Sequence, residues 1–426
     1  MFKNLLALFR SPDLRKKIII ILLLLVVFRV MAVIPLPDVN KEQLKTVLAS
    51  SQFFSLFNLF TGGAFSNVSI VMLGVGPYIT ASIIMQLLTM VFPGLKAYFY
   101  EGTDKEKALF EQYTRILTIP LALLQGFAFL NLFKNQGIMT FGSPFLMLRD
   151  VIIATAASFF LMWLGELMTE QKIGNGISFI IFTGIVINLP KEIYQTIRTI
   201  VSTDPTKIPN MIAFFIISLL VIVGVVFISR GQRKIPVNYA KQVRGTKIYG
   251  GADTYLPLRV NQAGMIPIIF AVSILMFPQM IGNFISTSQS PFLLKLSLVL
   301  KGFDSTSWSY LIIYFILVCL FTFFYTSITF EPNEIAENLQ KRGGFIPGYR
   351  PGQTTSNYLA NTSRRITLFG ALFLGSIAIL PIILAKVTGI TTMAISGASI
   401  LIMVEVAIET IEALEAQLIM REYEIS

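Results

Sequence analysis

Few residues of this chain have the types that catalysis or metal binding requires. The chain has no histidine and one cysteine, Cys319, so the usual metal ligand and proton shuttle is missing and no disulfide can form within it. The phosphate-binding sequence G-x-x-x-x-G-K-S/T does not occur. The sequence therefore predicts a protein that is not an enzyme and that holds no metal or cofactor.

The acidic residues near the end of the chain share one helical face. They recur at three- and four-residue steps, as Glu405, Glu409, Glu412 and Glu415. Only Glu405 can lie deep in a membrane helix, where a buried carboxylate is by default a functional candidate. Because it is near the cytoplasmic end, snorkelling and pairing with a basic residue are equally good interpretations.

Residues 57–90 join a short glycine-bearing segment to an apolar helix. The first part, 57–69, is too short and polar to cross a bilayer, which takes about 20 apolar residues. Its phenylalanines also make it unsuited to water, and irregular backbone at membrane depth survives only inside protein or a water-filled cavity. We expect a re-entrant element seated in a cavity, with an external loop as the alternative. The candidate residues are Phe57, Phe60, Gly62, Gly63, Phe65 and Ser66.

The following helix and other apolar runs contain both branched aliphatic and polar side chains at positions that could matter for function. Val75, Ile79 and Ile83 stack at four-residue intervals, and Ile177 and Ile181 repeat the spacing. Lipid contact or packing is the simplest interpretation of such a stripe. Polar residues in apolar helices mark either helix packing or a wet seam between helices that part, and here they are Thr80, Gln86, Gln125 and Gln279.

The elements that must position these residues are membrane-spanning helices. Of 426 residues, 54% are hydrophobic and 13% charged, and the mean hydropathy is +0.72. This composition predicts an all-α polytopic membrane protein. Ten apolar runs have spanning length: 18–35, 71–92, 116–133, 151–168, 177–193, 211–228, 263–285, 310–330, 366–385 and 391–411.

Charge sets the orientation of these spans. The first run is too long for a signal peptide and lacks a small-residue cleavage site, so we expect it to remain as a span. Of the Lys and Arg residues, 23 lie on the side of the N-terminus, ten on the opposite side, and Arg29 lies within the first span. We therefore expect both termini in the cytoplasm.

Five spans on either side of about residue 205 suggest two halves of opposite orientation, with a functional cavity between them. The expected organisation is a cytoplasmic segment 1–17, halves 18–205 and 206–412, and a cytoplasmic tail 413–426.

Two long cytoplasmic loops carry more charge than orientation requires. Residues 230–259 hold seven basic residues and one acidic residue, Asp253, around the turn signals Arg244-Gly245 and Gly250-Gly251. This pattern predicts a protruding hairpin, and we expect 331–365 to form a second one. Ordinary topological charge is the simplest explanation, but an anionic partner, such as nucleic-acid phosphate or an acidic protein face, is favoured.

The whole chain resembles the SecY family, the central subunits of bacterial protein-conducting channels. The most specific matching stretches, in order, are FNLFTGGA at 57–64, PYITASII at 77–84, MWLGE at 162–166, IGNGIS at 173–178, RGQR at 230–233, PVNYAK at 236–241, LPLRVN at 256–261 and GYRPG at 348–352.

The resemblance implies an hourglass of two pseudo-symmetric inverted halves that opens sideways between spans two and seven. It implies that the re-entrant segment is a plug and that Thr80, Gln86, Gln125 and Gln279 line the lateral gate. The docking sites for SecA and the ribosome would be Lys241, Arg244, Lys247 and Arg350. The implied pore ring consists of Val75, Ile79, Ile177, Ile181, Ile269 and Ile402.

The implied function is passage of unfolded secretory preproteins across the bacterial cytoplasmic membrane, with release of apolar segments into membrane lipid. SecE, SecG, the SecA ATPase, the ribosome and the nascent polypeptide are the implied partners. A secondary transporter with inverted five-helix repeats is the main alternative, although it would need polar groups at the midplane. A membrane-embedded hydrolase would need a nucleophile with a base or a metal pair.

Overall fold

A computed structural model describes most of the chain. The described residues are 12–37, 39–40, 43–44, 58, 61–92, 94–95, 103–203, 205–239, 242–244, 247–249, 253–285, 290–301, 307–388 and 396–425.

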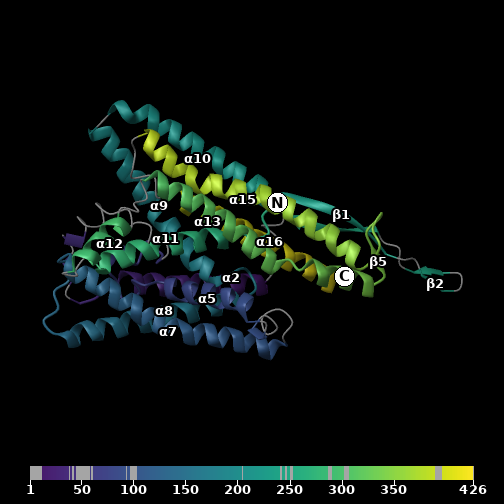
Figure 1. The fold of residues 1–426 in the computed structure, drawn as a ribbon, viewed down its shortest axis with the longest axis horizontal. Coiled ribbons are helices and arrows are strands. Elements are labelled where there is room, and N and C mark those ends of the chain that lie inside the picture. The colour runs from purple at the N-terminus through teal and green to yellow at the C-terminus, as the bar shows by residue number, and fades with distance from the viewer. Residues whose placement is uncertain are drawn as a thin grey trace. The chain divides into compact units, whose positions relative to one another are not determined.

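Long helices dominate the structure, and each of the ten predicted spans falls on one of them (Figure 1). Among the described residues, six helices are long and apolar enough to cross a membrane: α7, α8, α9, α10, α13 and α15. The prediction of an all-α polytopic fold is confirmed. The helices on the ten spans are α2 (Pro12–Val33), α5 (Gly76–Val91), α7 (Asp104–Asn135), α8 (Pro144–Thr169), α9 (Gly176–Thr203), α10 (Ile208–Ser229), α11 (Ile266–Ile285), α13 (Trp308–Thr329), α15 (Gln353–Thr388) and α16 (Ser396–Ile425).

By their contacts, the helices group into two compact units. The first comprises Met1–Thr206, Ser273–Ser305 and Val406–Ser426, and the second comprises Lys207–Val272 and Thr306–Glu405. In the first unit α8 packs against α2, α5, α7 and α9, and an ion pair between Arg115 and Glu166 (Nε to Oε1, 2.8 Å) joins α7 to α8. In the second unit α15 packs against α10, α13 and α14. The inverted symmetry of the predicted halves stays a prediction.

The first of the two long polar loops is a β-hairpin, as its alternation and turn signals predict. Strand β1 (Gln232–Tyr239) pairs antiparallel with β4 (Asp253–Arg259), and β2 (Gln242–Arg244) pairs with β3 (Lys247–Tyr249) nearer the tip. On β1, Ile235 and Val237 are buried while their neighbours are not, which is the period of two expected of a half-buried strand.

The second long polar loop is not a hairpin, and this prediction was wrong. Residues 331–365 form helix α14 (Pro332–Lys341), the short strand β5 (Gly344–Phe345) and the start of α15, and β5 pairs with β1. Pro332 stands in the first turn of α14, where its missing N–H costs nothing. Lys341 donates to Glu337 one turn earlier (Nζ to Oε1, 2.7 Å), which stabilises the helix and lowers the pKa of Glu337.

Two helix boundaries also differ from those predicted, and some elements were not predicted at all. Residues 71–75 form turns, because Gly74 has a positive φ of 56° and α5 begins only at Gly76 with Pro77 in its first turn. Helix α15 begins thirteen residues before the apolar run, at Gln353. The sequence did not predict α12 (Pro291–Lys301), and short 3₁₀ turns lie at η1 (Phe65–Asn67) and η2 (Pro205–Lys207).

Candidate functional site

The predicted re-entrant segment is a buried, irregular piece of chain that leads into α5. Residues 61–65 are buried, so the segment is not an exposed loop. Its own polar side chains hold its backbone: Asn58 Oδ1 accepts from Ser66 N (2.8 Å), and Ser66 Oγ donates to Gly63 O (2.8 Å). Ser69 Oγ donates to Ala64 O (3.0 Å). Serine and asparagine in this apolar region therefore satisfy backbone groups that no helix pairs.

Backbone hydrogen bonds fasten the segment to the chain that follows α2. Leu36 N donates to Val68 O (2.9 Å), and Ile70 N donates to Ile34 O (2.9 Å). Pro35 and Ser69 form an antiparallel bridge between these bonds. The segment is thus joined to the first span through a short strand-like contact.

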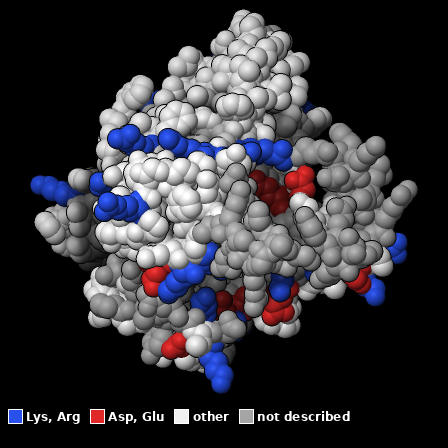
Figure 2. All heavy atoms as spheres, turned by 90° about the vertical axis from the view of Figure 1, so that its right-hand side faces the viewer, with Lys and Arg blue, Asp and Glu red and all other residues white. Residues whose placement is uncertain are grey.

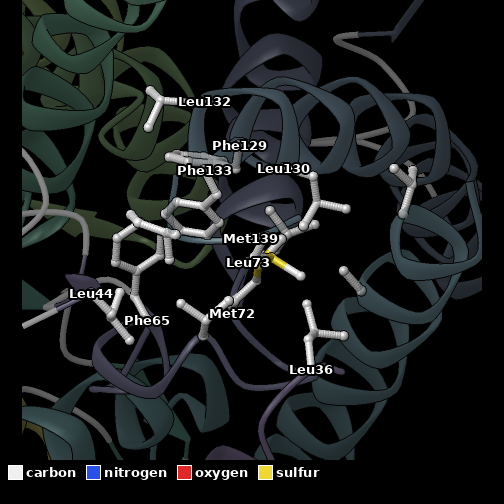
Figure 3. Packing of buried hydrophobic residues seen from close by; sticks show 14 of the residues in the cluster. Leu36, Leu44, Phe65, Met72, Leu73, Phe129, Leu130, Leu132, Phe133 and Met139 are labelled. Atoms are coloured by element: carbon white, nitrogen blue, oxygen red, sulfur yellow. The ribbon is translucent and has the colours of Figure 1, made fainter. Parts of the chain in front are cut away.

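Phe65 anchors the segment in the hydrophobic core of the first unit. Its ring lies 5.5 Å from that of Phe129 and 5.3 Å from that of Phe133, both on α7, and Figure 3 shows the three rings among buried leucine and methionine side chains. Aromatic contacts at these distances add to the free energy gained from burying the ring. The anchor fixes the segment to α7.

The tightest contact of the segment is at its two glycines. Gly62 and Gly63 have φ of 64° and 82°, which side chains with a Cβ rarely adopt. A Cβ added to Gly184 of α9 would lie 2.0 Å from Gly62 Cα, so the two backbones touch. Arg29 of α2 donates from Nη1 to Gly62 O (2.7 Å). We call Arg29, Gly62, Gly63 and Gly184 the glycine seat.

The structure therefore brings Gly62, Gly63, Phe65 and Ser66 together in one compact segment. Phe57 and Phe60 lie outside the described residues. Sequence reasoning noticed Arg29 only as a charge within a span, and it did not single out Gly184. A glycine in a β-branched helix was the available signal for Gly184, but its partner is more than a hundred residues away in sequence.

Of the six aliphatic residues assigned to a pore ring, five are buried within their units and one is half-buried. In the first unit Val75 and Ile181 are fully buried, Ile79 is buried, and Ile177 is half-buried. Val75 caps α5, and Ile79 N donates to Val75 O one turn further along (3.0 Å). In the second unit Ile269 and Ile402 are buried. Their assembly into one ring stays a prediction.

The polar residues assigned to a lateral gate occupy different settings. Thr80 Oγ1 donates to Gly76 O (3.0 Å) and accepts from Gln125 Nε2 (3.5 Å), a contact between α5 and α7. Gln86 donates to Ser82 on its own helix (3.2 Å), while its Oε1 is buried and has no hydrogen-bond partner among the residues that the structure describes. The side chain of Gln279 lies outside the described part of the structure. The gate assignment stays a prediction.

In the second unit Arg350, one of the predicted docking residues, lies next to a small sheet that packs on two helices, and we call this sheet with α14 and the start of α15 the platform. The sheet order is β4-β1-β5, and its buried face packs on α14 and α15 through Ile235, Val237 and Leu359. Arg350 is exposed on a turn whose neighbour Tyr349 stacks on Tyr358 with ring centroids 4.1 Å apart. This ring stacking holds the turn, and with it the backbone of Arg350, in place.

At the other end of the platform the hairpin extends outward. Arg244 and Lys247 pair in register across β2 and β3, and Lys241 lies outside the described residues. Sequence reasoning did not single out three further exposed basic residues on β1 and β4: Arg233, Lys234 and Arg259. Figure 2 shows many Lys and Arg side chains and fewer acidic ones on the side where β1, β5 and β2 lie in Figure 1.

Comparison with known proteins identifies the family. The SecY family model matches residues 69–411. The protein translocase subunit SecY of Mycobacterium leprae is 39% identical over 455 residues, covering 100% of this chain and 99% of that protein. The SecY subunit of Thermus thermophilus is 40% identical over 436 residues, covering 100% of this chain and 97% of that protein. This chain belongs to the SecY family.

Solved structures show the same fold for this SecY-family chain. A protein-conducting channel matches with a TM-score of 0.64 at 18% identity, covering 93% of this chain and 91% of that one. Sec61 from a canine ribosome–channel complex matches with a TM-score of 0.63 at 18% identity, over 93% and 91%. A SecY protein whose plug domain is described as stabilising its closed state matches with a TM-score of 0.63 at 19% identity, over 92% and 90%. Membership of the SecY family excludes the alternative interpretation of this chain as a secondary transporter.

Proposed function

We propose that this SecY-family chain is the protein-conducting subunit of a bacterial translocation channel. It passes unfolded secretory polypeptides across the cytoplasmic membrane and lets apolar segments leave sideways into lipid. It has no enzymatic activity of its own in this proposal. The observation that carries the proposal is the buried irregular segment held between α2, α7 and α9 by the glycine seat and Phe65.

The segment suits the role of a plug because its attachments can be released one at a time. Its contacts include the guanidinium–carbonyl hydrogen bond at Gly62, the close approach of Gly62 to Gly184, a strand-like pair of hydrogen bonds, a hydrogen bond from Asn67 Nδ2 to Ala32 O (3.4 Å) and one aromatic anchor. No continuous helix has to unfold when it moves. The plug assignment rests on Gly62, Gly63, Phe65 and Ser66, which lie in this segment, and extends to Phe57 and Phe60 from the sequence.

The six aliphatics are proposed to form the constriction. Branched aliphatic side chains offer ions and water no hydrogen bonds, so a narrow waist lined with them tends to dewet. Their contacts are also non-directional, and they can part around polypeptides of many sequences. A charged ring would hold some segments and slow their passage.

Sideways release is proposed to follow from partition energetics. A Leu or Ile at the bilayer centre gains about 0.3 to 0.6 kcal/mol, while an Asp, Lys or Arg costs about 2.5 to 3.5 kcal/mol. Over roughly 20 residues this difference separates spanning segments from secreted ones. The seam is proposed to lie between spans two and seven, lined by Thr80 and Gln86 of span two, Gln279 of span seven and Gln125 of the neighbouring span three.

Energy must come from partners, since the sequence contains no phosphate-binding loop of the P-loop type. The proposed partners are the SecA ATPase and the translating ribosome, which bind the basic platform through Arg350, Arg244, Lys247 and Lys241. The small subunits SecE and SecG complete the proposed channel. Charge distribution favours placing the platform and both termini in the cytoplasm.

Crosslinking tests the function directly. A secretory chain stalled during translocation should crosslink to a photoreactive residue placed at Ile79, and the same probe at Ile187, an exposed residue of α9, should not react. The crosslink should disappear when the stalled chain lacks its signal sequence. Equal labelling from both positions, or none from Ile79, would remove Ile79 from the translocation path.

A further inference from the structure

Glu405 of α16 binds both ends of the cytoplasmic hairpin. Ser229 Oγ donates to Glu405 Oε2 (2.7 Å), and Asn261 Nδ2 donates to Glu405 Oε1 (2.9 Å). Both donors are buried, with 7% and 6% of their surface exposed. Each carboxylate oxygen thus has a donor from a different part of the chain.

The two donors stand where the hairpin joins the membrane helices. Ser229 is the last residue of α10, three positions before β1 begins, and Asn261 lies two positions after β4 ends. Between them, Val260 N donates to Gly231 O (2.9 Å) and closes the base of the hairpin. Asn261 also donates to Gly264 O (3.3 Å), in the turn that leads to α11. Glu405 therefore fastens the closed base of the hairpin to α16.

The same stretch of α16 carries a residue assigned to the pore ring. Ile402 lies three residues before Glu405, which is about 4.5 Å along a helix with a rise of 1.5 Å per residue. Leu401 and Ile402 are both buried, so this turn of α16 is packed within its unit. A displacement of the carboxylate would move this turn as a whole, because the helix is stiff over so short a distance.

Helix packing alone does not call for a carboxylate here. An apolar residue would fill the same place without the cost of taking a charge out of water. A carboxylate does offer two acceptor oxygens that can hold two donors at once, and hydrogen bonds to a charged acceptor are short and strong. The geometry thus favours a carboxylate that connects three segments of the chain over a side chain that only fills space between helices.

We propose that Glu405 is a positioning residue that couples the cytoplasmic hairpin to α16. When a partner moves the hairpin, Ser229 and Asn261 pass the displacement to Glu405, and α16 carries it to the turn that holds Ile402. This proposal rests on the proposed function for its partner and its pore ring. We call the contact of Glu405 with Ser229 and Asn261 the joint. All three residues lie in the second unit, so the joint and the proposed function can be tested separately.

The first experiment tests the joint without any partner. Amide hydrogen exchange of the purified membrane-reconstituted channel should show that Glu405→Ala speeds exchange at 230–232 and 260–264 by about tenfold or more, because the base of the hairpin is released. Glu415→Ala removes a carboxylate ten residues further along the same helix and should leave these amides unchanged. Unchanged exchange in Glu405→Ala would overturn the joint.

Two milder variants keep the test informative if Glu405→Ala assembles poorly. Ser229→Ala removes one donor with little change in volume and should produce part of the effect. Glu405→Gln keeps an acceptor for Asn261 and should restore much of the protection. The double variant Ser229→Ala with Glu405→Ala should exchange no faster than Glu405→Ala alone, since both changes break the same contact. Strictly additive effects would contradict the shared contact.

The second experiment separates coupling from binding. With the ATPase partner added to reconstituted channels, Glu405→Ala should lower the rate of translocation about tenfold while the Kd for the partner stays within about twofold. Equal losses of binding and rate, or an unchanged rate, would overturn the coupling. If wild-type channels bind the partner but move no polypeptide, the proposed function fails, and the exchange experiment still decides whether the joint exists.

Discussion

A charged side chain in the first span, Arg29, holds the backbone of the glycine seat by a hydrogen bond. Arg29 donates to the carbonyl of Gly62, a residue of the proposed plug that has no helical partner for that oxygen. The sequence predicted that the plug segment is buried, because its composition suits neither lipid nor water. It could not predict the partner of Arg29, since that contact depends on how the chain turns back against α2.

Replacing Arg29 with Leu should loosen the plug. A buried carbonyl left without its donor costs about 1 to 3 kcal/mol, and each 1.4 kcal/mol changes an equilibrium about tenfold. The unseated fraction should therefore rise by about fivefold to 150-fold, seen as more frequent openings of resting channels in planar bilayers. Arg29→Lys keeps a charged donor and should lie between Arg29→Leu and wild type. Identical opening frequencies in all three would show that Gly62 does not need Arg29.

Gly184 tests the same seat from the side of α9. A Cβ there would overlap the backbone of Gly62 at 2.0 Å, and overpacking of this kind costs about 1 to 3 kcal/mol. Gly184→Ala should therefore raise resting conductance and lower the unfolding temperature. The control is Gly224→Ala in α10, whose added Cβ would meet Phe373 at an ordinary 3.9 Å. If both variants conduct alike, Gly184 does not hold the plug in place.

At the scale of elements, sequence patterns predicted the hairpin but not the platform beneath it. Alternating burial on β1 and glycine turn signals are local features, so the hairpin could be predicted from neighbouring residues alone. Helix α14 was missed because glycine and proline signals later in the loop outweighed its short amphipathic run. Its apolar residues, Ile335 and Leu339, gain their burial from contacts with the sheet and with α15, which lie outside this local sequence pattern.

The platform makes a specific prediction about Arg350. Reversal to Glu should lower ATPase-driven export about tenfold, because a charge facing an anionic partner contributes to both encounter and docking. Channel assembly should be unaffected, since Arg350 is exposed and its turn is held by Tyr349 and Thr355. Arg342→Glu makes the same charge change at the end of α14 and should have a smaller effect. Equal effects of the two variants would point to overall charge in place of a specific docking residue.

At the scale of the whole molecule, the proposed seal combines a plug and a ring that act in series. The number of spans could be predicted from apolar runs, because hydropathy sums over many residues; their direction, inferred from charge, stays a prediction. The ring was assigned by motif position, since burial of branched aliphatics alone does not distinguish a constriction from ordinary packing. Burial of Val75, Ile79 and Ile181 agrees with either interpretation, and conductance separates the two.

Replacing both Ile79 and Ile181 with Gly should open a leak in the resting channel. The change removes eight side-chain carbons from the proposed waist, and water can enter a constriction that no longer dewets. Glycine also weakens a helix by about 1 kcal/mol, so the matched control is Ile187→Gly on α9, where the side chain is 47% exposed. Conductance of reconstituted channels should rise in the first variant and stay at the wild-type level in the control. Adding Arg29→Leu to the double glycine variant should raise conductance beyond either change alone, because ions must pass both barriers. A triple variant that conducts no more than Arg29→Leu alone would show that these isoleucines pack the helices and do not close the pore.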